Sequence, residues 1–152
     1  MVSASDDYTI RIWDIATGEE KELITGFSDY IYGLACKKNG HIVAGCRDGI
    51  LKVYDPASKK FIIDIQAHEK HIYCVSILPD QSIATGAVDN SIKFWNSKTG
   101  DLQKTLYGHH YPLRAFAMME DGTLASGAED NLVLLWNSGR TDCCFTFTGH
   151  TK

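Results

Sequence analysis

Residues 82–109 read SIATGAVDNSIKFWNSKTGDLQKTLYGH and contain the clearest fold signal in the chain. It holds three short apolar runs, and each run is closed by turn-forming residues: Asp89-Asn90, then residues 96–100, then Gly108-His109. Asn, Asp and Gly allow tight reversals because they tolerate a positive φ or bond to their own backbone. The stretch therefore predicts three antiparallel strands, over residues 82–87, 91–95 and 102–106, and the run at 71–78 predicts a fourth strand before them.

The same pattern recurs every 41 residues along the chain. Each unit repeats a bulky aromatic residue, a turn aspartate and a position where histidine is preferred. Several columns in one register indicate a true internal repeat, and such repeats point to stacked structural units. The three columns are Trp13, Tyr54, Trp95 and Trp136; Asp7, Asp48, Asp89 and Asp130; and Phe27, His68, His109 and His150.

Each predicted third strand carries large side chains on both faces. Ile92 and Phe94 are two residues apart and share one face, as the period of a strand requires, whereas Trp95 points the other way. A sheet with large residues on both faces must be packed on both sides. The sequence therefore predicts an all-β chain of stacked sheets, with units bounded approximately at 1–27, 28–68, 69–109 and 110–150 and with no helix.

With these residues in view, the chain resembles the WD-repeat β-propeller family over essentially its whole length. The resemblance rests on the Gly-His pairs at 108–109 and 149–150, on the turn aspartates, and on Ile12-Trp13-Asp14 and Phe94-Trp95-Asn96. It implies a single propeller segment, residues 1–152, of about four blades. Each blade would be a four-stranded antiparallel sheet, and the first would be incomplete.

The resemblance also implies a hydrogen-bond network inside a blade. Trp only donates, Asp only accepts, and His with a hydroxyl bridges the two. The second unit departs from this pattern, because Phe27, Ala44 and Tyr54 replace His, hydroxyl and Trp. We expect packing to replace the network there, in a blade that is weaker or more mobile. The two expected networks are His68, Thr85, Asp89 and Trp95 in the third unit, and His109, Ser126, Asp130 and Trp136 in the fourth.

The four units do not show whether the chain closes into a complete propeller ring. Residues 1–4 align with the second strand of a unit, and the chain stops two residues after His150. Three alternatives follow: a fragment of a longer propeller, a dimer in which two arcs close a ring, or closure on four blades alone. In the closed forms His150 would complete a network with Ser3, Asp7 and Trp13.

Composition narrows the function classes. The chain is 44% hydrophobic and 22% charged with a net charge of −4, which argues against a broad surface for nucleic acid or an anionic membrane. No apolar run reaches the roughly 18–20 residues of a membrane span, and the N-terminus lacks the layout of a signal peptide. Five cysteines without a C-x-x-C pair favour free thiols, so we expect an intracellular protein, cytoplasmic or nuclear.

The resemblance places a binding face around the central channel. It implies a scaffold for a protein or peptide partner, with self-association as a further option. Arg47 and Arg114 are an alternative pair of contacts for a partner peptide that is acidic or phosphorylated. A purely structural piece of a larger assembly is the alternative, and an enzyme is a distant third. No catalytic residue, metal ligand or cofactor is predicted. The predicted partner-binding residues are Tyr30, Tyr32, Arg47, His71, Tyr73, Arg114 and Glu129.

Overall fold

The computed structural model describes residues 1–119, 121–137 and 143–151, and its regular structure consists of antiparallel sheets. The first sheet has three strands, β1 (Val2–Ala4), β2 (Ile10–Trp13) and β3 (Glu20–Ile24). Three four-stranded sheets follow in chain order. The described residues contain no helix, so the expectation of an all-β chain is confirmed. Among these residues no helix is long and apolar enough to cross a membrane.

Each four-stranded sheet places its strands side by side in the order of the sequence. The second sheet comprises β4 (Ile31–Cys36), β5 (Ile42–Cys46), β6 (Ile50–Asp55) and β7 (Lys60–Gln66). The third comprises β8 (Ile72–Ile77), β9 (Ile83–Ala87), β10 (Ile92–Trp95) and β11 (Leu102–Leu106). The fourth comprises β12 (Leu113–Met118), β13 (Leu124–Ala128), β14 (Val133–Trp136) and β15 (Phe145–Phe147).

The repeated aspartates make the turn between the second and third strands of each sheet. Asp48 Oδ1 accepts from the amide of Ile50 at 3.1 Å, and Asp89 Oδ1 accepts from the amide of Ser91 at 3.0 Å. A carboxylate that binds the amide two residues onward imitates a backbone turn, which is why aspartate suits this position.

The sheets stack face to face, and an apolar cluster fills each gap between neighbours. Between the second and third sheets, Leu51 and Val53 pack against Ile72, Ile83 and Trp95. The gap is narrow: a Cβ added at Gly45 would lie 2.4 Å from Ile72 Cγ2, so only glycine fits there. Similar clusters join the first sheet to the second and the third to the fourth.

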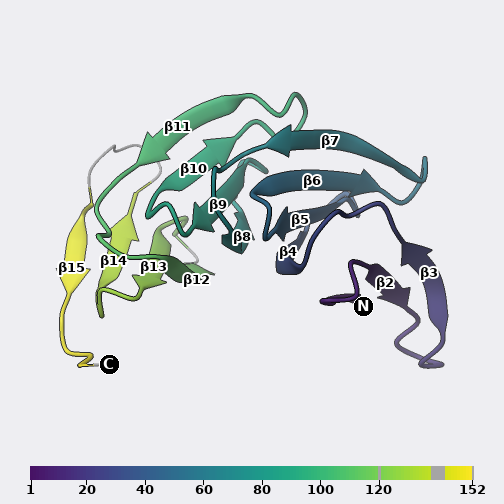
Figure 1. The fold of residues 1–152 in the computed structure, drawn as a ribbon, viewed down its shortest axis with the longest axis horizontal. Coiled ribbons are helices and arrows are strands. Elements are labelled where there is room, and N and C mark those ends of the chain that lie inside the picture. The colour runs from purple at the N-terminus through teal and green to yellow at the C-terminus, as the bar shows by residue number, and fades with distance from the viewer. Residues whose placement is uncertain (120, 138–142, 152) are drawn as a thin grey trace.

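The four sheets form an open arc (Figure 1). β4, β8 and β12 are the first strands of their sheets, and contacts run from β1 to β4, from β4 to β8 and from β8 to β12. The first and fourth sheets lie at opposite ends, so the chain does not close on four blades alone in this structure. The expectation of a propeller segment with an incomplete first blade is confirmed by the three-stranded first sheet.

Candidate functional site

A β-bulge recurs near the start of the first strand in each complete sheet. In β4, Ile31 pairs with Cys46 and Gly33 with Gly45, so Tyr32 has no partner in the register. The same shift leaves out Tyr73 in β8 and Arg114 in β12. A bulge interrupts the ladder and re-aims one side chain. Three successive sheets thus turn a large side chain outward at the same level.

These three side chains stack on one another across the sheets. The rings of Tyr32 and Tyr73 lie 5.2 Å apart between centroids, with 22° between their planes. Arg114 Cζ lies 4.0 Å from the centroid of Tyr73 on the other side, within the range of a cation–π contact. Tyr30 continues the series, with its ring centroid 6.1 Å from that of Tyr32, and the ring centroid of Tyr8 lies 5.4 Å from that of Tyr30. We call Tyr8, Tyr30, Tyr32, Tyr73 and Arg114 the aromatic row.

The other predicted partner-binding residues flank the aromatic row. Arg47 lies with Cζ 5.3 Å from the centroid of the Tyr30 ring. His71 makes an edge contact with Tyr73, and its Nδ1 donates to the backbone carbonyl of Arg47, which links the second and third sheets. Glu129 accepts a hydrogen bond from Arg114 Nε at 2.7 Å. The structure therefore gathers all seven of these residues into one surface.

Tyr8 belongs to this surface although the family positions do not include it. Its column in the repeat otherwise holds Gly49, Asn90 and Asn131, which are residue types suited to a positive φ. Tyr8 adopts a φ of 66° there, an unusual conformation for a bulky side chain. An aromatic residue in a glycine–asparagine turn column is the sequence signal that identifies it.

The charges on this face are already paired. Arg114 pairs with Glu129, and Arg47 Nη1 lies 3.9 Å from Asp29 Oδ1. A carboxylate or phosphate ligand would have to compete with these neighbours for each guanidinium. The aromatic surfaces are partly open, since Tyr8 and Tyr32 are 42% and 38% exposed. The geometry favours contact with flat, partly apolar groups over capture of an anion.

A buried network braces the third sheet below the row. His68 Nδ1 lies 2.8 Å from Asp89 Oδ2, and His68 Nε2 lies 2.7 Å from Thr85 Oγ1. Trp95 Nε1 donates to the same hydroxyl oxygen at 2.8 Å. One proton arrangement satisfies every member: neutral His68 donates to Asp89, Thr85 donates to His68, and Trp95 donates to Thr85. The loop before β8 is thereby attached to β9 and β10.

The fourth sheet repeats the arrangement. His109 Nδ1 lies 2.8 Å from Asp130 Oδ2, while Ser126 Oγ meets both His109 Nε2 and Trp136 Nε1 at 2.7 Å. Burial raises the pKa of Asp130, but hydrogen bonds from His109 and His110 outweigh it and the pKa is lowered. Burial likewise raises the pKa of Asp89, and hydrogen bonds from His68 and Ser91 lower it to about 2. Both carboxylates are thus held charged.

The second sheet fills the same place with aromatic packing. Phe27 and Tyr54 each make an edge contact with Phe61, with ring centroids 5.3 and 5.4 Å apart. Ala44 is buried among apolar neighbours, and Tyr54 Oη reaches Glu22 of the first sheet at 2.6 Å. The polar partners have been replaced together, so Phe27 leaves no buried hydroxyl or indole without a partner.

The end of the arc beyond Arg114 carries a cavity of about 330 Å³ beside Arg114 and Glu129. His150 lines it, at the opposite end of the arc from Ser3 and Trp13, so the network that closure would have formed is not made. Trp13 Nε1 instead donates to Ser3 Oγ at 2.7 Å without a histidine. The described residues hold no group of three or more His, Cys, Asp or Glu that suits a metal ion.

Comparison with known proteins places the chain in a family. The family model described as "WD domain, G-beta repeat" matches residues 1–14, 18–55, 59–96 and 100–137. Each of the three longer matches begins with the outer strand of one sheet and ends with the third strand of the next, so the sequence repeat and the sheet are offset by one strand.

Individual relatives match shorter stretches. Coronin-7 of Mus musculus is 42% identical over 59 residues, which cover 38% of this chain and 6% of coronin-7. Nuclear distribution protein nudF of Aspergillus niger is 36% identical over 70 residues, covering 45% of this chain and 16% of nudF. The matched stretches are thus small parts of these relatives. The crystal structure of the computationally designed protein Ika8 superposes with a TM-score of 0.86 at 30% identity, over 98% of this chain and 46% of Ika8.

Proposed function

Because the chain belongs to the WD-repeat family, we propose that it binds a protein or peptide partner through the aromatic row and its flanking residues. Members of the family generally act as protein-interaction scaffolds, and they are generally not enzymes. The observation that carries the proposal is the continuous stack of Tyr32, Tyr73 and Arg114, which three equivalent bulges turn outward. Tyr and Arg are the residues that most often dominate interface energy.

The row suits an extended segment that crosses several sheets. Its five side chains come from all four sheets, and the tyrosine rings are held by one another and by the bulged backbone. Preformed aromatic surfaces cost little entropy on binding, because Tyr has only two side-chain torsions and here they are restricted by stacking. Such a partner would place apolar or planar groups over the rings and polar groups along Arg47, His71 and Glu129.

The test is the triple variant Tyr32→Ala, Tyr73→Ala and Arg114→Ala. We expect affinity capture with the purified chain to lose its specific partners, because each truncated anchor costs on the order of 1–2 kcal/mol of binding free energy. Circular dichroism and thermal unfolding check that the sheets persist. Lys60→Ala, on the exposed outer strand β7, is the matched control and keeps the wild-type set of partners. Equal capture by the triple variant would overturn the proposal.

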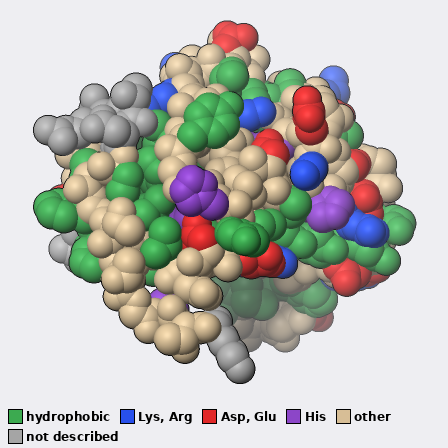
Figure 2. All heavy atoms as spheres, turned by 60° about the vertical axis from the view of Figure 1, so that its left-hand side comes forward, with side chains coloured by type: hydrophobic (Ala, Val, Ile, Leu, Met, Phe, Trp, Pro, Cys, Tyr) green, Lys and Arg blue, Asp and Glu red, His purple; other side chains and the backbone are tan. Residues whose placement is uncertain are grey.

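One observation favours a second candidate, a structural role inside a larger assembly. The outward face of the fourth sheet repeats a face that is buried in the second sheet: Val133 and Leu135 occupy the positions of Leu51 and Val53. Phe145 and Phe147 continue this face and are exposed. Figure 2 shows hydrophobic side chains at the surface of this end of the molecule. Such a face suits another blade, from a longer chain or from a second copy.

Solution mass separates these options for the purified chain. A dimer by sedimentation would support ring closure by two arcs, whereas a monomer that binds a hydrophobic dye would show that the open faces stay unfilled. The double variant Phe145→Ser and Phe147→Ser would dissociate a dimer that forms through this face and would leave the aromatic row intact. For location, we propose the interior of the cell, cytoplasmic or nuclear, on the ground that the five cysteines are free thiols.

A further inference from the structure

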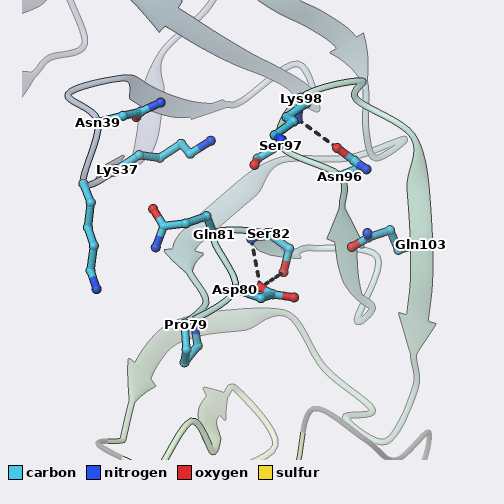
Figure 3. Close-up of a pocket in the computed structure, with 11 residues that line it drawn as sticks. Lys37, Asn39, Pro79, Asp80, Gln81, Ser82, Asn96, Ser97, Lys98 and Gln103 are labelled. Atoms are coloured by element: carbon cyan, nitrogen blue, oxygen red, sulfur yellow. Dashed lines mark hydrogen bonds between the residues drawn. The ribbon is translucent and has the colours of Figure 1, made fainter.

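A second cavity lies on the opposite face from the aromatic row. Antiparallel strands place the turns at 37–41, 78–82 and 96–100 at the far end of the sheets from Tyr32 and Tyr73. These three turns of the second and third sheets surround a cavity of about 570 Å³ (Figure 3). None of the residues predicted to bind a partner lines it, so the cavity is independent of the proposed function.

Lys37 is a mostly buried residue that lines this cavity. The residue is 7% exposed, and among the described residues no hydrogen bond or ion pair of its Nζ is found, although Nζ itself is not one of the fully buried atoms. In Figure 3 its side chain extends from the first turn toward the turn that carries Ser97 and Lys98. The equivalent positions in the third and fourth sheets hold Leu78 and Met119, so an apolar residue satisfies the fold at this point. An ammonium in its place, on a side chain with little access to water, is stabilised by a nearby anion.

Lys98 is a second departure from the repeat at the same cavity. The equivalent residues in the first and second units are Ala16 and Ala57, so the turn does not require a long basic side chain. Burial lowers the pKa of Lys37, and the positive charge of Lys98 lowers it further. Lys37 and Lys98 thus carry two mutually repelling ammonium groups at positions where the equivalent residues of other units are neutral.

Gln81 is a third departure. It adopts a φ of 69°, whereas the equivalent positions are Gly40 with φ 90° and Gly122 with φ 84°. A side chain in this left-handed conformation is strained, and strain of this kind often marks a functional position. Figure 3 shows the Gln81 side chain extended toward the turn of Lys37 and Asn39, where its amide adds a neutral hydrogen-bonding group.

The cavity has more basic than acidic side chains. Of its lining residues Lys37, Lys38 and Lys98 are basic and Asp80 alone is acidic. Asp80 Oδ1 accepts from the amide and the hydroxyl of Ser82 at 2.9 and 2.6 Å. Arg114 of the aromatic row and Arg47 beside it are each paired with a carboxylate, so the two faces differ in the ligand that they favour.

We propose that this cavity is a second binding site, which takes a segment of a protein partner through one or two oxyanions, carboxylate or phosphate monoester. Lys37 and Lys98 would supply the charge, and the amides of Gln81 and Asn39 would bind the remaining oxygen atoms. Three residues that depart from the repeat, each in a separate turn, line this cavity and supply cationic and polar groups.

The surroundings favour a peptide over a nucleic acid or a small metabolite. No aromatic side chain lines the cavity, so a base has nothing on which to stack. The chain carries a net charge of −4, which repels a polyanion at longer range. The cavity is open to solvent along the rim, and it would leave much of a small molecule uncovered. A peptide that presents one acidic side chain inward fits these conditions.

The test measures binding of labelled peptides by fluorescence anisotropy. The probes are one Gly-Ser peptide with two glutamates, the same peptide with two phosphoserines, and a neutral version with glutamine. We expect at least one acidic peptide to bind and the neutral peptide to fail, with an affinity that falls as salt is raised. Lys37→Leu, which copies the third sheet, is expected to weaken binding about tenfold or more, since a charge-assisted hydrogen bond is lost. Lys98→Ala should weaken it severalfold.

Matched controls keep the result specific. Lys60→Leu removes one exposed lysine outside the cavity and should bind as the wild type does. The variant without Tyr32, Tyr73 and Arg114 should also bind these peptides, so failure at one face is distinguishable from failure at the other. Thermal unfolding confirms that Lys37→Leu is folded. The proposal is overturned if Lys37→Leu binds as well as the wild type, if the neutral peptide binds equally, or if inorganic phosphate binds but neither acidic peptide does.

Discussion

The second and third sheets attach the loop before their first strand in different ways. Both must fix the loop before the first strand to the strands beside it. The third sheet does so with His68, Thr85, Asp89 and Trp95, whose buried polar atoms are all paired. The second does so with Phe27 packed edge-on against Phe61, and with Tyr54 bonded to Glu22 in the neighbouring sheet.

This contrast indicates that the His–hydroxyl–Asp–Trp network behaves as a unit. A buried polar group is costly when its partner is missing, so members are retained together or replaced together. The second sheet has lost histidine, hydroxyl and indole at once, and its Asp48 accepts from the hydroxyl of Ser28 instead. The structure therefore shows a packed second sheet; the expectation that this blade is weaker or more mobile stays a prediction.

The largest expected effect comes from importing one residue of the second sheet into the third. His68→Phe removes one hydrogen-bond partner from the Thr85 hydroxyl and one from the Asp89 carboxylate, and leaves the Trp95 indole bound to a hydroxyl that has lost its histidine. We expect the free energy of unfolding to fall by about 3 kcal/mol, measured by urea denaturation with tryptophan fluorescence. Adding Thr85→Ala and Trp95→Phe should recover a large part of the loss. A single variant as stable as the wild type would contradict the view of the network as a unit.

Acid should destabilise the third and fourth sheets through the carboxylates of their hydrogen-bond networks. The pKa of Asp89 is about 2 in the folded chain against an ordinary value of 3.8. A lowered folded pKa stabilises the protein above the unfolded value, and this contribution is lost as the pH falls from about 4 toward 2. Urea midpoints measured across this range should therefore fall for the wild type and fall less for Asp89→Asn. Parallel pH profiles for the two proteins would show that Asp89 does not contribute; Asp130 supplies part of the remaining slope.

The smallest expected effect concerns the first turn of each sheet, where the second sheet has Gly40 and the third has Gln81. Gln81→Gly relieves a left-handed conformation but gives the unfolded chain more freedom, and the two effects partly cancel. We expect a gain of about 0.5 kcal/mol in stability, seen as a slightly higher midpoint of thermal unfolding. Gly40→Gln should show the opposite sign. A loss of stability in Gln81→Gly would mean that the glutamine side chain supports the turn.

Much of the architecture could be predicted from the sequence because it depends on local periodicity. A 41-residue step with strand alternation and turn aspartates predicts four sheets of similar register, and the structure has them. The positions of the network residues also follow from that step, since the same turn recurs in each unit. Even the departure at Phe27 could be read directly, because its column is otherwise histidine.

The candidate surfaces depend on distances between sheets, which no single repeat contains. The step of 41 residues relates Tyr32, Tyr73 and Arg114, but their stacking follows from the bulges and from the narrow gap at Gly45. Tyr8 was not among the predicted residues, since the family positions omit a turn column that usually holds glycine or asparagine.

The repeat, the strands and the residues available for each network follow from the order of amino acids, because these depend on neighbours along one chain segment. Which side chains meet depends on how the sheets pack. Lys37 and Lys98 belong to different units and different turns, and they line one cavity because the second and third sheets stack face to face. The open arc is likewise a property of packing: the angle between neighbouring sheets is set by the side chains in each gap, and the order of residues does not state it.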